Sequence, residues 1–228
     1  MSLELSKYLF KSSILLEKVK DIYINDLENI KTIISFKKGE VLYEEGSVPK
    51  AVFRLQTGKV KIEQLNPDGK TRIVYVYTVG EFFGFRPLLC NENHPVTAIF
   101  LEDSQIELYE GTRFIEITKK SPNLSFNLLE ILSYEFNVWI NLISSLSHKS
   151  AKEKIALILL ILNEKYKDKD NISEITMTKA DIAKYSETSE ETVVRVIGFF
   201  ENENILINNG RSIEITNHKL LSILSEGF

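Results

Sequence analysis

The segment from Ile175 to Ile215 constrains the fold of this chain more than any other part of its sequence. Its pattern predicts four elements in order: a short helix over 178–185, a turn over 186–188, a second helix over 189–201 and a hairpin over 205–215. This order is the layout of a winged helix-turn-helix, whose second helix lies in the major groove of DNA. The segment therefore predicts a chain that reads DNA.

Polar residues at the ends of the predicted elements support this layout. Thr178 followed by Asp181, and Thr188 followed by Glu191, each resemble a capping box, whose side chains satisfy free amides at the start of a helix. Asn209-Gly210 supplies residues that tolerate a positive φ, as a two-residue hairpin turn requires. We therefore expect Thr178 and Thr188 to cap the two helices.

The second predicted helix has two distinct faces. Its apolar positions share one face and are expected to pack inward: Val193, Ile197 and Phe200. Another face is expected to point outward: Glu191, Val194, Arg195 and Gly198. The residues predicted to contact DNA come from both helices and from the hairpin: Thr178, Lys179, Ser189, Glu190, Glu191, Thr192, Arg195 and Arg211.

Charge limits the kind of nucleic-acid binding that this chain can carry out. The net charge is −4, whereas nonspecific nucleic-acid binders are usually basic. Four cations lie in or beside the predicted DNA face: Lys179, Lys184, Arg195 and Arg211. Five carboxylates nearby repel phosphate: Glu187, Glu190, Glu191, Glu201 and Glu203. We therefore expect weak nonspecific binding that is lost early as salt rises.

Other classes of protein are excluded by composition and hydropathy. The polar start of the chain, with Glu4 close behind Met1, predicts no secretory signal peptide. The longest apolar run, 155–162, is too short to cross a bilayer. A single cysteine, Cys90, excludes an internal disulfide and a cysteine-held iron–sulfur cluster, and is expected to be a buried small hydrophobe. We therefore expect a cytoplasmic protein without membrane contact.

The first half of the chain has the pattern of a β protein. One or two short helices are expected within residues 1–30. Residues 33–109 then show short alternating apolar segments broken by turn residues. Many short strands at regular spacing are typical of a β-sandwich or jelly roll. We therefore expect an N-terminal β-roll.

The period becomes helical in the second half. A long helix is expected over 123–147 and another over 151–166, followed by the polar connector Lys167–Asn171. The sequence thus predicts an α+β chain of three parts: a β-roll over 1–122, a long helix over 123–148 and the winged helix-turn-helix over 149–228.

A heptad pattern runs along the long predicted helix. Its positions step by three and four residues in turn: Leu128, Leu132, Glu135, Trp139, Leu142 and Leu146. Such a stripe packs either against the β-roll of the same chain or against a second copy as a parallel dimer seam. The pattern alone leaves both alternatives open. Glu135 is awkward in a dry seam, where it would serve to fix the register.

A β-roll, a long heptad helix and a C-terminal winged helix-turn-helix, in this order, resemble the cAMP receptor protein/FNR family of bacterial transcription regulators. The resemblance covers nearly the whole chain. It depends on turn and helix motifs in both halves: Lys38–Gly46, Leu55–Lys61, Gly80–Gly84, Ile182-Ala183 and Thr188–Arg195. The first three match the glycine-bearing turns of a cyclic-nucleotide-binding domain. The family implies a homodimer joined through the long helices, a palindromic site in double-stranded DNA, and RNA polymerase as a partner.

The resemblance also implies which residues read bases. The family's base readers fall on Glu190, Glu191 and Arg195, where Glu191 accepts from a cytosine amine and Arg195 donates to guanine O6 and N7. Glu190 departs from the pattern, because cAMP receptor proteins carry Arg there. A structural alternative stands beside this assignment: Glu191 is the capping partner of Thr188, or pairs with Arg195 one turn away.

The resemblance fails where the family holds a cyclic nucleotide. Family pockets use a Glu directly after a Phe-Gly pair for the ribose, and an Arg further on for the cyclic phosphate. Here Phe83-Gly84 is followed by Phe85, and the Arg position falls on or near His94, which is neutral at pH 7. We therefore expect no cAMP binding and no other cofactor, with an apolar effector or none.

Seven residues define the candidate effector pocket: Phe83, Gly84, Phe85, Arg86, His94, Thr97 and Trp139. Arg86 is an alternative cation for the missing Arg, although it lies at the other end of the segment. Trp139 falls near the family's usual base contact, where small hydroxyl residues are expected. Its alternative role is packing in the core or in a seam.

Rival functions receive less support from the sequence. A metal-dependent β-roll enzyme needs clustered His and Glu ligands, but the three histidines are far apart in sequence: His94, His148 and His218. We identify no catalytic residues, no metal ligands and no phosphate-binding loop. Haem sensing through His94 is a further alternative. The more serious rival is a degenerate regulator that acts by protein contact without binding DNA, because the recognition helix is acidic.

Overall fold

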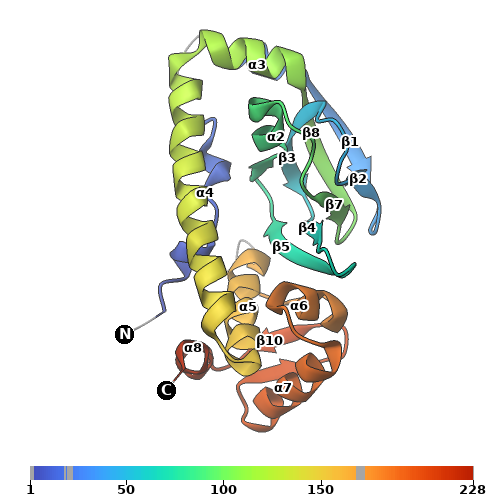
Figure 1. Ribbon diagram of the computed structural model, residues 1–228, viewed down its shortest axis with the longest axis vertical. Coiled ribbons are helices and arrows are strands. Elements are labelled where there is room, and N and C mark those ends of the chain that lie inside the picture. Colours follow the sequence, from blue (N-terminus) through green and yellow to red (C-terminus); the bar gives the residue numbers. More distant parts are fainter. Residues whose placement is uncertain (1–2, 18, 20–22, 168–172, 228) are drawn as a thin grey trace. The chain divides into compact units, whose positions relative to one another are not determined.

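The computed structural model describes the whole chain except residues 1–2, 18, 20–22, 168–172 and 228 (Figure 1). The chain divides into two units, Phe10–Phe136 and the combination of Met1–Leu9 with Asn137–Phe228. The division falls inside one long helix, so the predicted three-part division stays a prediction. Among the described residues, none of the helices has both the length and the apolar character that a membrane crossing needs.

The first unit is built on two antiparallel sheets. Their strands are β1 (Lys31–Phe36), β2 (Val41–Tyr43), β3 (Ala51–Thr57), β4 (Val60–Leu65), β5 (Thr71–Tyr77), β6 (Phe82–Phe83), β7 (Thr97–Phe100) and β8 (Ser104–Glu110). One sheet has the order β1-β8-β3-β6 and the other β2-β7-β4-β5. Apart from the hairpin of β4 and β5, which lies in one sheet, consecutive strands alternate between the sheets, as in a jelly roll. The predicted β-roll is confirmed, and its strands run from Lys31 to Glu110, slightly beyond the expected 33–109.

Aromatic side chains join the two sheets. Phe36 on β1 stacks on Phe100 of β7, with ring centroids 4.4 Å apart. Phe83 on β6 stacks on Tyr77 of β5 at 4.8 Å. Such pairs bury large apolar area between the sheets.

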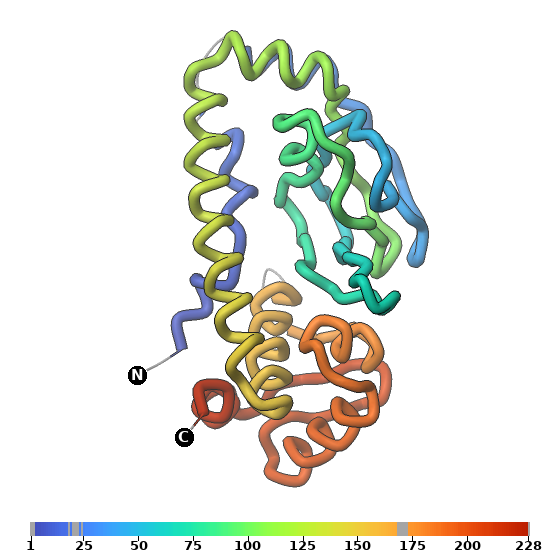
Figure 2. The backbone as a smooth tube through the Cα atoms, viewed as in Figure 1, coloured from blue at the N-terminus to red at the C-terminus, as the bar shows by residue number. Residues whose placement is uncertain are grey.

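Short helices surround the sheets. They are η2 (Ser12–Ile14), α1 (Ile24–Asn29), α2 (Phe85–Cys90) and α3 (Gly111–Lys120), and the first part of α4 (Pro122–His148) belongs to the same unit. The apolar core combines residues of these helices with the β1-β8-β3-β6 sheet: Leu15, Leu27, Val52, Phe82, Phe85, Tyr109, Phe114, Leu124, Leu128 and Ile131. The N-terminal segment lies along α4 (Figure 2), where Asn127 Nδ2 donates to the Leu15 carbonyl over 3.1 Å.

The predicted heptad stripe of α4 faces its own chain. Leu128, Glu135 and Leu142 are no more than 2 % exposed, which decides in favour of packing within the chain at these positions. A different face of α4 carries the exposed apolar residues: Phe126, Leu129, Phe136, Ile140 and Ile143. These residues also step by three and four, with Ser133 at the intervening heptad position. The helix therefore has one apolar face that is covered and one that is open.

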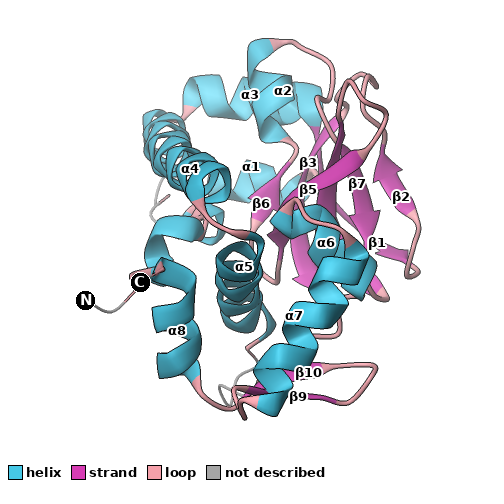
Figure 3. Ribbon diagram, turned by 60° about the horizontal axis from the view of Figure 1, so that its bottom comes forward, coloured by secondary structure: helices cyan, strands magenta, loops and turns pink. Residues whose placement is uncertain are grey.

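The second unit is a small helical domain with a hairpin (Figure 3). Its elements are η1 (Leu5–Tyr8), the end of α4, α5 (Ala151–Tyr166), α6 (Lys179–Ser186), α7 (Glu190–Asn202), β9 (Leu206–Asn208), β10 (Ile213–Ile215) and α8 (His218–Glu226). α5 is buried along Ile155–Leu162 and begins at a capping box formed by Ser150 and Glu153. Most of the predicted connector Lys167–Asn171 lies outside the described residues.

Candidate nucleic-acid interface and effector position

The helix-turn-helix begins as the sequence predicts. Thr178 is the N-cap of α6, and its side chain accepts a hydrogen bond from the Asp181 amide. α6 ends at Glu187, which has a left-handed conformation with φ of 51° and donates its amide to the Ala183 carbonyl. A non-glycine residue in this region is uncommon, and it turns the chain sharply into the next helix.

The second helix is capped one residue later than the sequence predicts. Ser189 is its N-cap, and the Ser189 Oγ accepts from the Thr192 amide at 3.1 Å. The Thr188 hydroxyl instead lies 3.0 Å from that of Ser186 in the turn. The predicted capping box of Thr188 and Glu191 is therefore wrong. The reason is the left-handed conformation of Glu187. After this turn the helix begins at Ser189, the hydroxyl residue that follows Thr188.

Because Glu191 does not pair with Thr188, its side chain is exposed in the first turn of α7. Within the described part of the chain, no ion pair joins Glu191 to Arg195, which is also exposed. Neither structural alternative for Glu191 is therefore present. Both side chains are accessible to a ligand that approaches this face.

The two faces of α7 separate as the sequence predicts. Its inward positions are buried against the rest of the unit: Val193, Val196, Ile197 and Phe200. Its outward positions in the first two turns are exposed: Glu190, Glu191, Val194 and Arg195. Thr192 is half-buried, and its hydroxyl lies 2.8 Å from that of Ser189. The first two turns of α7 thus present a mixed acidic, basic and apolar surface.

The hairpin is tied to the first helix of the motif. Lys179 Nζ donates to Asn208 Oδ1 at 2.9 Å and to the Gly210 carbonyl at 3.2 Å. This contact orients the hairpin, the wing of the motif, relative to α6, so Lys179 holds the wing as well as lying at the predicted DNA face. Arg211 is exposed in the wing loop.

The wing turn differs from the sequence prediction. Asn208 pairs with Ile213, and Asn209 donates its amide to the Ser212 carbonyl at 2.9 Å. Of the predicted turn pair, Gly210 alone has a positive φ, of 77°. The prediction that Asn209 and Gly210 together form the turn is therefore wrong. The chain reverses one residue later, after Asn209, and Gly210 supplies the left-handed conformation.

The first residues of the candidate effector position in the β-roll are buried in the protein. Phe83, Gly84 and Phe85 are all buried. Gly84 has φ of +82°, and a Cβ atom there would lie 2.8 Å from the ring of Phe53. The glycine in this turn is therefore required by both conformation and space.

Arg86 and Glu135 form a buried ion pair at this position. The Arg86 Nη2 contacts Glu135 Oε2, and the Arg86 Nη1 donates to the Tyr77 hydroxyl at 2.9 Å. The guanidinium also lies 5.1 Å from the ring centroids of Phe10 and of Phe85. These contacts join α2 to α4 through a cation held between aromatic rings.

Sequence reasoning missed this pair, although it contained the signal. Glu135 is 1 % exposed and stands in an apolar stripe. A carboxylate that is buried at such a position requires a cationic partner. Arg86, in the aromatic segment that starts at Phe82, was the available cation. Burial raises the pKa of Tyr77, whose neutral hydroxyl therefore accepts from Arg86 at physiological pH.

The other predicted pocket residues have partners of their own. His94 is 3 % exposed and stacks on Tyr43, with ring centroids 3.8 Å apart. Burial lowers the pKa of His94, which is therefore neutral at pH 7. Thr97 Oγ1 accepts from the Glu45 amide at 3.0 Å. Trp139 belongs to the other unit, and its predicted place in the pocket stays a prediction.

Two further observations on the first unit differ from or add to the sequence analysis. Cys90 is exposed at the end of α2, so the expectation of a buried thiol is wrong; the short helix ends there at the left-handed Asn91.

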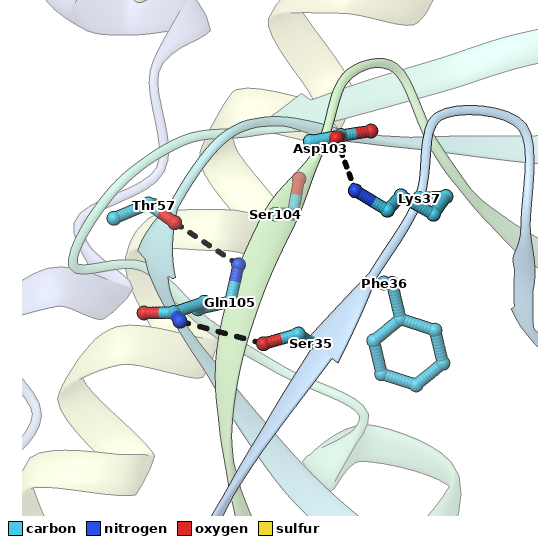
Figure 4. Close-up of a pocket in the computed structure, with 7 residues that line it drawn as sticks. All are labelled: Ser35, Phe36, Lys37, Thr57, Asp103, Ser104 and Gln105. Atoms are coloured by element: carbon cyan, nitrogen blue, oxygen red, sulfur yellow. Dashed lines mark hydrogen bonds and ion pairs between the residues drawn. The ribbon is translucent and has the colours of Figure 1, made fainter.

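A polar pocket of about 300 Å³ lies elsewhere on the β-roll (Figure 4), lined by Ser35, Phe36, Lys37, Thr57, Asp103, Ser104 and Gln105. Lys37 and Asp103 pair across it at 2.8 Å, and no predicted effector residue lines it.

A β-roll followed by a long helix and a winged helix-turn-helix defines a class of DNA-binding regulators that combine a sensor domain with a reading domain. Known domain families match both halves of the chain and agree with this class. Residues 33–121 match the model of the cyclic nucleotide-binding domain, and residues 153–223 match that of the Crp-like helix-turn-helix domain.

Complete proteins of this class are similar along most of the chain. The fumarate and nitrate reduction regulatory protein of Yersinia pestis is 27 % identical over 208 residues, covering 88 % of this chain and 83 % of that protein. The structure of FixK2 from Bradyrhizobium japonicum aligns with a TM-score of 0.78 at 22 % identity, covering 87 % of this chain and 99 % of that one. A regulator structure from Eubacterium rectale gives 0.75 at 17 % identity, with 93 % and 98 % covered.

The chain belongs to the CRP/FNR family of transcription regulators. It carries the family's helix-turn-helix DNA-binding domain, and members of the family are transcription regulators.

Proposed function

We propose that this protein is a homodimer that binds a palindromic DNA site sequence-specifically and does not respond to cAMP. The observation that carries the proposal is the outward face of α7, where Glu191 and Arg195 are exposed while the opposite face is buried. A carboxylate accepts from the cytosine amine, and a guanidinium donates to guanine O6 and N7. The face thus supports the reading of a G·C-containing half-site.

Dimerisation is supported by the open apolar face of α4. Its five large side chains, from Phe126 to Ile143, are each at least 52 % exposed and follow heptad spacing. Two parallel copies of this helix would bury them as a coiled-coil seam. A two-fold axis along the seam presents two α7 helices to DNA about 34 Å apart, which requires a palindromic site.

The surface charge shapes how this binding is measured. Glu187, Glu190 and Glu203 are exposed around α7 and repel phosphate. We therefore propose that nonspecific binding is weak, so discrimination between sites is large at moderate salt. Fluorescence anisotropy with fragments of the gene's own promoter, against shuffled fragments of equal length, at low and moderate salt, tests the proposal. We also propose that the protein contacts RNA polymerase and that it is located in the cytoplasm.

Replacement of Arg195 by alanine is expected to reduce specific binding by about 1–3 kcal/mol, as for one lost base contact. Affinity for shuffled DNA changes little, because Arg195 is assigned to bases rather than to phosphate. The measurement is a binding isotherm on the selected site and on variants at each base pair. Lys219→Ala, which removes an exposed cation on α8, is the matched control. An unchanged site preference in Arg195→Ala contradicts the assigned role.

We expect no cAMP binding. The residue after Gly84 is Phe85, so a ribose acceptor is missing, and Arg86 is already paired with Glu135. A cyclic phosphate would have to displace this buried pair without a second cation to replace it. Isothermal titration calorimetry with cAMP is expected to show no heat of binding. A micromolar affinity would overturn this part of the proposal.

The proposal needs no cofactor, and an apolar effector or none remains compatible with the aromatic lining around Phe83 and Phe85. Native mass spectrometry of the purified protein would reveal a bound small molecule.

The alternative function is regulation by protein contact alone, which the acidic residues around α7 favour. Absence of sequence-specific retardation at low salt would favour that alternative over DNA binding.

A further inference from the structure

One apolar side chain lies on the outward face of α7. Val194 is 56 % exposed, three residues after Glu191 and adjacent to Arg195. The other exposed apolar residue of this helix, Phe199, has the Lys152 ammonium 3.7 Å above its ring. Val194 thus differs from Phe199 in facing outward among the residues assigned to DNA.

The helical period fixes where Val194 points. Successive residues of an α-helix are 3.6 to the turn, so positions 190, 191, 194 and 195 form one contiguous patch. If α7 presents Glu191 and Arg195 to base edges, Val194, which lies one turn after Glu191 on the side of Glu190, approaches the same groove. This step rests on the proposed function, in which α7 lies in the major groove.

The chemistry of the major groove narrows what Val194 can contact. An isopropyl group has no donor and no acceptor, so it desolvates polar base edges without replacing their hydrogen bonds. The one apolar group that an unmodified base pair displays there is the C5-methyl of thymine. Contact with that methyl buries apolar area on both sides.

We infer that Val194 is a specificity-determining residue that selects thymine through its C5-methyl group, beside the base pair read by Glu191 and Arg195. Val194 adds an apolar requirement to a face whose other side chains are charged. The recognised half-site therefore contains an obligatory A·T pair of fixed orientation.

Deoxyuridine tests this inference at the level of one methyl group, because it differs from thymidine only there. The full-length protein first selects its site from random duplexes. Each thymidine of the selected half-sites is then replaced in turn by deoxyuridine, symmetrically in both halves. At one position we expect wild-type affinity to fall about fourfold per half-site, as for one methyl lost from contact. For Val194→Ala the same replacement is expected to change affinity by less than about twofold, because the partner of the methyl is gone.

Controls separate this inference from the proposed function. Val194→Ala replaces an exposed helical residue by one of higher helix propensity, so the fold is kept, which circular dichroism checks. Ile223→Ala on α8, 41 % exposed, removes a similar apolar group away from α7 and is expected to keep the full deoxyuridine response. If the wild type selects no site, the proposed function fails. If it selects a site but every deoxyuridine response is equal in wild type and Val194→Ala, the proposed function survives and this inference is overturned.

Discussion

The double variant Phe136→Glu/Ile140→Glu is expected to be a monomer that no longer binds the palindromic site. Both side chains lie on the open apolar face of α4, where Phe136 is 66 % and Ile140 is 52 % exposed in the single chain. Burial of each such side chain contributes about 1.5–3 kcal/mol. Glutamates at these positions would instead place four like charges along a seam between two copies.

Loss of the dimer is expected to have a large effect on DNA binding. Two linked reading domains gain about 10²–10⁴ in affinity over one, and a monomer loses this gain. Sedimentation velocity measures the oligomeric state, and anisotropy on the full palindrome and on a half-site measures binding. The variant is expected to bind both duplexes equally weakly.

Ser144→Glu is the matched control for this prediction. It adds one glutamate, where the double variant adds two, at an exposed position of α4 beside the heptad positions but not among them. We expect Ser144→Glu to remain dimeric and to keep binding the palindrome. A Phe136→Glu/Ile140→Glu protein that sediments as a dimer would show that the copies associate through another surface.

Replacement of Glu135 by alanine is expected to destabilise the first unit strongly. The carboxylate is 1 % exposed and pairs with Arg86, so its removal leaves a guanidinium between the rings of Phe10 and Phe85 without its counter-charge. Breaking a buried pair from one side costs about 3–5 kcal/mol. Arg86 keeps 30 % of its side-chain surface exposed, so water screens part of this cost. We therefore expect about 2–3 kcal/mol, measured by urea unfolding.

Two comparisons make the Glu135 prediction specific. Glu116→Ala removes an exposed carboxylate on α3 and is expected to change stability by less than about 0.5 kcal/mol. The double replacement Arg86→Met/Glu135→Leu removes both charges, and is expected to recover most of the loss, because apolar residues of similar volume replace buried pairs at little cost. An unfolding curve of Glu135→Ala that overlays that of Glu116→Ala would contradict a buried, paired role for Glu135.

Local order in the DNA-binding domain could be predicted because its signals lie close together in sequence. Thr178 caps α6 as expected, and Val193, Ile197 and Phe200 face inward as their spacing requires. The second cap was misplaced from Ser189 to Thr188 because both are hydroxyl residues. Only the left-handed turn at Glu187, which depends on how the two helices pack, distinguishes them.

The faces of α4 show a limit of periodicity. Two apolar stripes run along the helix, one through Leu128 and Leu142, the other through Phe136 and Ile140. Both have the spacing of a seam, and the sequence analysis singled out the one that the chain itself covers. Periodicity reports that a face is apolar but not what covers it, because the covering residues come from distant segments such as Leu15.

The sequence by itself determined the order of a β-roll, a long helix and a winged helix-turn-helix, because turn glycines, caps and helical periods act over a few residues. The resemblance to the family also predicts that the usual ribose acceptor is missing, since Phe85 follows the Phe83-Gly84 pair. Only the tertiary structure decided that Arg86 from α2 pairs with Glu135 from α4. Such a pair depends on how the chain brings two separate segments together, which no local pattern encodes.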